Sequence, residues 1–102
     1  MKIFKSFNIL NKEINFNHNI GFIPTMGSLH KGHLSLIKIA KNKSKKILVS
    51  IYINPSQFND KKDFLKYPRS LKKDISILKK LKVDYLFLPH DREIYKKGIK
   101  KK

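Results

Sequence analysis

Two histidines three residues apart, His30 and His33, are the side chains in this sequence best suited to chemistry on a phosphate. Imidazole exchanges protons near neutral pH and donates hydrogen bonds to phosphoryl oxygens. Both lie in GFIPTMGSLHKGH (residues 21–33), whose pattern predicts a strand end, a loop and the first turn of a helix. Helix N-termini bind anions through free N–H groups, and Gly27 and Gly32 allow a ligand to approach the backbone. We therefore predict a phosphate site here, with both histidines on one face of a helical turn.

The alternatives for this pair are a metal site or two surface histidines without a ligand. A metal site needs a third ligand, and His18 and His90 lie on unrelated segments, so we predict no metal ligands in the protein. The N-terminus of a helix disfavours imidazolium, whereas a bound triphosphate favours it. Because a triphosphate would be closer and would carry more charge, we expect both rings to donate to it when it is bound.

The net charge of +17 limits the class of partner. A nucleic-acid or anionic-membrane surface is one interpretation. Only Arg69 and Arg92 are arginines, and the lysines are spread over the chain instead of forming a stripe, so we favour compositional bias and expect no specific nucleic-acid or membrane partner. The chain has no cysteine, no apolar run of about 18 residues and no signal-peptide pattern, which fits a cytoplasmic protein.

Hydrophobic periodicity predicts alternating strands and helices, hence an α/β fold with a Rossmann-like parallel sheet. Strands are expected at 3–4, 20–23, 47–53 and 83–88, and helices at 6–14, 34–41 and 70–81, with one further turn at 91–95. Ser6 and Ser70 are expected to cap helices, and Pro24 to end its strand. Within 34–41, the residues expected to face the sheet are Leu34 and Ile37, with Ala40 and Leu36 as further candidates. Residues 47–53, ILVSIYI, are apolar on both faces, as in a central parallel strand.

Polar residues follow two of these strands. Ligands bind beyond the carboxyl ends of parallel strands, so the fold should bring Asn54 and Gln57 to the same edge as His30 and His33. The Gln57 amide could orient a hydroxyl or a carboxylate, and Phe58 could form an apolar wall. The alternative is a polar loop beside a core aromatic residue.

Four stretches of the sequence form a recognisable series: IGFIPTMGSLHKGHLSLIKIA at 20–40, VSIYINPSQF at 49–58, DFLKYPRSLKKDISILKKLKVDYLFLP at 63–89 and EIY at 93–95. In these stretches the sequence resembles the pantoate–β-alanine ligase (pantothenate synthetase) family. PTMGxLHxGH, NPxQF and YPR in this order are highly specific. The resemblance implies a nucleotidyltransferase-type domain of the HxGH kind that joins pantoate to AMP and then to β-alanine, with Mg²⁺ as cofactor.

Site residues are implied by the same resemblance. The ATP-binding segment would comprise Met26, Gly27, Ser28, Leu29, His30, Lys31, Gly32 and His33. His33 matches the proton donor of the family, and His30 is its expected catalytic neighbour. Gln57 matches a residue that contacts pantoate and β-alanine, with Asn54 and Phe58 near the same pocket. Lys31 and Lys62 stand where acidic residues are common in the family.

The resemblance covers only the early part of a family member, and it fades at Lys96, where a proline is common. We expect residues 1–95 to form an incomplete nucleotide-binding domain and 96–102 a lysine-rich tail, in a fragment that is inactive or very weak alone. Full-length members are expected to be homodimers. The rival interpretations are another HxGH nucleotidyltransferase, such as a cytidylyltransferase or phosphopantetheine adenylyltransferase, and a basic binding module without catalysis.

Overall fold

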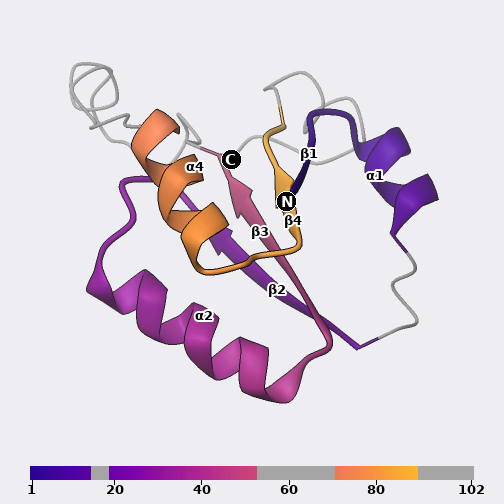
Figure 1. Cartoon of the computed structure of the whole chain (residues 1–102). Coiled ribbons are helices and arrows are strands. Elements are labelled where there is room, and N and C mark those ends of the chain that lie inside the picture. Colours follow the sequence, from indigo (N-terminus) through magenta and orange to yellow (C-terminus); the bar gives the residue numbers. More distant parts are fainter. Residues whose placement is uncertain (15–18, 53–70, 90–102) are drawn as a thin grey trace, which may run out of the picture.

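The computed structural model describes residues 1–14, 19–52 and 71–89, which form a parallel sheet flanked by helices (Figure 1). Along the chain the elements are β1 (Lys2–Phe4), α1 (Phe7–Glu13), β2 (Ile20–Thr25), α2 (Lys31–Lys43), β3 (Lys46–Ile51), α4 (Leu71–Lys80) and β4 (Tyr85–Phe87). This alternation confirms the predicted α/β class. The helical turn predicted at 91–95 lies outside the described residues.

The four strands pair in the order β1-β4-β3-β2, and every pairing is parallel. β3 is therefore flanked on both sides, and all of its residues after Lys46 are buried. The run ILVSI is apolar because both faces of this strand are covered. Thr25 lies opposite Ile51 in the register, so β2 and β3 end at the same edge of the sheet.

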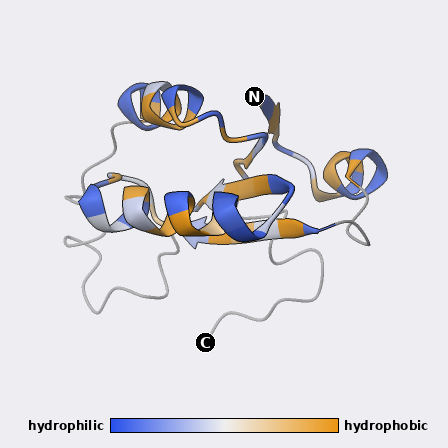
Figure 2. Cartoon of the chain, turned by 60° about the horizontal axis from the view of Figure 1, so that its bottom comes forward, coloured by the Kyte–Doolittle hydropathy of each residue, from blue (hydrophilic) through white to orange (hydrophobic). Residues whose placement is uncertain are grey.

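Two hydrophobic clusters lie on opposite faces of the sheet. One contains Ile37 of α2 and Leu78 of α4, packed with Val49 and other strand residues. The other contains Leu10 of α1, packed on Leu48. Alternate residues of β3 thus face α2 and α4 on one side and α1 on the other. Figure 2 shows hydrophobic residues concentrated along the strands, with both hydrophilic and hydrophobic residues on each helix.

Three local predictions are corrected by the structure. β2 runs through Pro24 to Thr25, because β2 is an edge strand of the sheet that the described residues form, and a proline there need not interrupt the ladder. Leu36 does not face the sheet but is 54% exposed, since Ile37 and its helical neighbours occupy the covered face. Ser6 is the N-cap residue of α1, as predicted, yet its side chain makes no capping hydrogen bond.

Helix α2 also begins earlier than expected. It starts at Lys31 with His30 as its N-cap residue, so His33 lies in its first turn. Among the described residues, no helix has the length and hydrophobicity that a membrane span requires.

Candidate active site at the start of α2

The loop between β2 and α2 is fixed by an unusual backbone path. Gly27 has a φ of 83° and Ser28 a φ of 50°, both in the left-handed region. The Thr25 hydroxyl donates to the Ser50 carbonyl at 3.0 Å and accepts from the Gly27 N–H at 3.1 Å. One buried hydroxyl therefore ties the end of β2 both to β3 and to the turn that follows.

The two histidines cap helix α2 reciprocally. The His30 Nδ1 accepts from the Gly32 N–H at 3.0 Å, and the His33 Nδ1 accepts from the His30 N–H at 3.2 Å. Their ring centroids are 4.2 Å apart. The prediction that the two rings share one face of a helical turn is confirmed, and each ring also satisfies a backbone donor that the helix start would otherwise leave unpaired.

This capping fixes which ring nitrogen carries the proton. A neutral imidazole has one N–H donor and one acceptor, and here Nδ1 is the acceptor in both rings. The proton therefore lies on Nε2 in each case. The pair presents two Nε2–H donors that are not used by the cap, which is the arrangement that donation to phosphoryl oxygens requires.

The electrostatic environment favours the neutral form of His33. Burial lowers the pKa of His33 from its usual value, the neighbouring His30 lowers this pKa further, and the carboxylate of Asp74 partly opposes both. Protonation would also place a donor on Nδ1 facing the His30 N–H. A group held neutral without phosphate can gain a proton when an anion binds beside it.

Asp74 is a residue of this site that the sequence reasoning missed. It lies in α4, is 2% exposed, and its two carboxylate oxygens accept from the N–H groups of Ser28 and Leu29, both at 2.9 Å. The signal in the sequence was an acidic residue on the apolar stripe of a helix, one turn before Leu78. The cradle was expected to have free amides, but these two are bonded to α4.

The residues that the resemblance places at or near pantoate and β-alanine lie outside the described residues: Asn54, Gln57 and Phe58. What the structure does describe is where their segment begins. The Tyr52 N–H donates to the Thr25 carbonyl at 3.0 Å, so the chain leaves β3 beside the end of β2. This confirms the shared edge from which the prediction was made.

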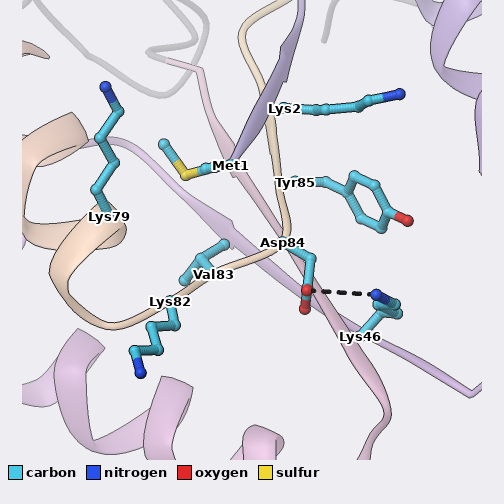
Figure 3. Close-up of a pocket in the computed structure, with 8 residues that line it drawn as sticks. All are labelled: Met1, Lys2, Lys46, Lys79, Lys82, Val83, Asp84 and Tyr85. Carbon is cyan, nitrogen blue, oxygen red and sulfur yellow. Dashed lines mark ion pairs between the residues drawn. The ribbon is translucent and has the colours of Figure 1, made fainter.

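A hollow of about 470 Å³ lies at the opposite edge, near the amino ends of β1, β3 and β4, and is lined by Met1, Lys2, Lys46, Lys79, Lys82, Val83, Asp84 and Tyr85. Figure 3 shows the ammonium groups of Lys2, Lys79 and Lys82 pointing in different directions. Lys2 is paired with Glu13, and Lys46 with Asp84. Divergent, partly neutralised cations do not converge on one anion, so this hollow is a poor rival to the histidine loop.

The described residues contain no group of three or more His, Cys, Asp or Glu side chains placed to hold a metal ion. Mg²⁺ prefers oxygen ligands, and the two oxygens of Asp74 are already bonded to backbone amides. The N–H donors at the loop therefore suit an anion such as phosphate better than a free metal ion.

Known proteins resemble this chain in sequence and in fold. Residues 2–102 match the model of the family described as pantoate-beta-alanine ligase. The chain belongs to the pantoate–β-alanine ligase family. Similar sequences include pantothenate synthetases from Francisella philomiragia, 46% identical, and Buchnera aphidicola subsp. Acyrthosiphon pisum, 50% identical. These matches cover 95% and 97% of this chain but 37% and 36% of the relatives.

Solved structures of the family superpose on the same part. The pantoate-beta-alanine ligase of Francisella tularensis, solved in complex with beta-gamma ATP and beta-alanine, matches with a TM-score of 0.86 at 44% identity, over 94% of this chain and 38% of that one. The pantothenate synthetase of Thermus thermophilus matches with a TM-score of 0.88 at 35% identity, over 98% and 36%. The chain thus spans little more than a third of these relatives' length, and the fold is the HxGH nucleotidyltransferase fold of the family.

Proposed function

We propose that this chain carries the nucleotide-binding part of an enzyme that condenses pantoate with β-alanine at the expense of ATP, yielding pantothenate, AMP and pyrophosphate. The observation that carries the proposal is the histidine pair at the start of α2. Each Nδ1 is occupied by a backbone N–H, and each Nε2–H is left for phosphate. Family membership supplies the reaction class, and the fold supplies the place where ligands of parallel sheets bind.

In the first step, a carboxylate oxygen of pantoate attacks the α-phosphorus of ATP. An O–P bond forms, the bond from the α-phosphorus to pyrophosphate breaks, and pantoyl adenylate results. Negative charge shifts onto the phosphoryl oxygens and the departing pyrophosphate. Donors already fixed in position stabilise this charge without reorganisation, and the Nε2–H groups of His33 and His30 are assigned this role.

In the second step, the amine of β-alanine attacks the acyl carbon of the adenylate. A C–N bond forms, the C–O bond to AMP breaks, and the proton lost from the amine nitrogen passes to solvent. Pantoate and β-alanine are assigned to Gln57, with Asn54 and Phe58 beside it, on the strength of the NPSQF motif. The residues assigned to ATP are Met26, Gly27, Ser28, Leu29, His30, Lys31, Gly32 and His33.

Four finer features belong to the same proposal. Mg²⁺ would enter with the triphosphate and supply charge neutralisation there. The whole enzyme is taken to be cytoplasmic, where ATP and its co-substrates are metabolites, and to be a homodimer, as the resemblance to the family implies. Residues 1–95 are assigned to the nucleotide-binding domain and 96–102 to a lysine-rich tail.

The test is isotope exchange between pyrophosphate and ATP, which reports the first step alone. The 102-residue chain is assayed by itself and with the remaining part of the Francisella tularensis relative supplied as a separate polypeptide. We expect exchange that depends on pantoate, and a loss of about 100-fold or more in His33→Ala. His33→Asn retains an acceptor for the His30 N–H, so it separates lost chemistry from a lost cap.

Two outcomes would contradict the proposal. Exchange that ignores pantoate but responds to a phosphorylated alcohol would indicate another HxGH nucleotidyltransferase. No exchange under either condition, together with tight sequence-selective DNA binding, would indicate a basic binding module.

A further inference from the structure

We propose that Asp74 is a positioning residue for the nucleotide loop: its buried carboxylate holds the backbone of Ser28 and Leu29 and thereby places the histidine pair for phosphate. The inference rests on the proposed function only for the identity of the ligand. The positioning itself follows from contacts between α4 and the loop.

The first observation is the geometry of the contact. Both oxygens of Asp74 accept from consecutive backbone amides, at 2.9 Å each, across more than forty residues of sequence. The carboxylate is almost wholly buried. A buried carboxylate is stable only when its oxygens are satisfied, and these two amides satisfy them. The contact is therefore a bidentate clamp between α4 and the loop.

The second observation is where the clamp acts. Ser28 and Leu29 directly precede His30, the N-cap residue of α2. A β-carbon on Gly27 would lie 3.2 Å from the Asp74 Oδ2, so the loop passes close against the carboxylate. Moving the clamp would shift the N-cap residue and, through the His30 N–H, the ring of His33.

The third observation is electrostatic. The charge of Asp74 raises the pKa of His33, against burial and His30, which lower it. Among the described residues these are the groups that act on His33, His30 from the N-cap and Asp74 from the neighbouring helix α4. Asp74 thus acts on His33 in two ways, through the position of the backbone and through charge.

The clamp also determines which donors of the loop are available to a ligand. The N–H groups of Ser28 and Leu29 are taken by the protein's own carboxylate, so they are not free for phosphate while the clamp holds. Binding of the triphosphate then depends more on the Nε2–H donors of the two histidines. A loop held by its own helix is preorganised before ATP arrives.

The test compares Asp74→Asn with Asp84→Asn in the 102-residue chain. Asp84 is the matched control because its Oδ2 also accepts a backbone N–H, that of Ile47 at 2.8 Å, at the opposite edge of the sheet. Three quantities are measured by NMR: hydrogen exchange of the Ser28 and Leu29 amides, the titration of His33, and the Kd for ATP. The asparagine side chain keeps the size of aspartate but turns one acceptor into a donor.

In Asp74→Asn we expect amide exchange to accelerate about tenfold or more at Ser28 or Leu29, and ATP to bind about tenfold more weakly. The pKa of His33 should fall, because the charge that raised it is gone. Asp84→Asn should leave all three unchanged. A folded Asp74→Asn protein with wild-type exchange and wild-type His33 titration would overturn the proposal.

Two further results keep the outcome decisive. If Asp74→Asn does not fold, hydrogen exchange of the wild-type chain tests the clamp. Fast exchange of the Ser28 and Leu29 amides there would contradict the proposal. The proposed function is decided separately, by the pyrophosphate exchange described above with the remaining part of the enzyme supplied. If the wild-type chain alone does not bind ATP, amide exchange and the His33 titration still decide the positioning.

Discussion

Among single residues, His33 uses its two ring nitrogens in different ways. Its Nδ1 accepts from the backbone of His30, and its Nε2 is left to donate. The cap fixes the tautomer and burial lowers the pKa of the ring, so a side chain that stabilises the helix also carries the Nε2–H that the proposed function assigns to phosphate. Substitutions at His33 must therefore be read for stability and for binding separately.

The lowered pKa of His33 predicts how stability depends on pH. In the unfolded chain His33 takes up a proton near pH 6.5, whereas in the folded chain the same ring takes it up only at lower pH. The contribution of His33 to stability is therefore present above pH 6.5 and is lost as pH falls through the folded pKa. Urea unfolding between about pH 7 and about pH 5 should show a larger loss for the wild type than for His33→Asn, which does not titrate. Parallel pH profiles would contradict this.

Gly27 is the position where the loop least tolerates a side chain. Its φ is 83°, and a β-carbon would lie 3.2 Å from the Asp74 Oδ2 and 3.3 Å from the Ile51 Cγ2. Gly27→Ala should lower the free energy of unfolding by about 1–2 kcal/mol or more. Gly32→Ala is the comparison: it lies in helix α2 without a left-handed φ, and its β-carbon would lie 2.9 Å from the Cε1 of the exposed His30 ring, a side chain that can shift. Denaturation curves should show a clearly smaller cost at Gly32, and equal costs would argue against backbone strain at Gly27.

At the scale of elements, the end of β2 depends on one hydroxyl. Thr25 is 9% exposed and bonds both the Ser50 carbonyl of β3 and the Gly27 N–H. Thr25→Val keeps the shape of the side chain but leaves both partners unsatisfied, so it should cost about 1–3 kcal/mol in the free energy of unfolding. Thr25→Ser retains the hydroxyl and should cost less in the same urea titration. If valine and serine behaved alike, the hydroxyl would not hold this junction.

At the scale of the whole molecule, α2 is anchored by one face. Ile37 lies on the covered face of α2 and is fully buried, whereas Ile39, on the same helix, is 53% exposed. Ile37→Ala should cost about 2–5 kcal/mol, because it removes core contacts and leaves a cavity. Ile39→Ala should remain within about 0.5 kcal/mol of the wild type. Thermal unfolding of the two variants checks this, and similar costs would mean that the helix packs on a different face.

Elements with a strong hydrophobic periodicity could be predicted from the sequence. The order of elements and the parallel sheet could be predicted because β3 is apolar on both faces and α4 keeps a helical period. The histidine pair was found because its spacing is local. Asp74 was missed because its role depends on contacts with residues more than forty positions away, which no local pattern encodes. The prediction that Pro24 ends its strand was wrong because the place of β2 as an outer strand follows from the strand order of the whole sheet, which no local pattern shows.

The most direct test of the central claim is an ATP titration of the ¹⁵N-labelled chain, followed at the histidine side chains at about 0.15 M salt. That salt concentration suppresses weak attraction to the charge of +17. We expect saturable shifts at the Nε2 positions of His30 and His33, with a rise in the pKa of His33 as the triphosphate binds. Shifts that are non-saturating, spread over the lysines and abolished by salt would contradict it.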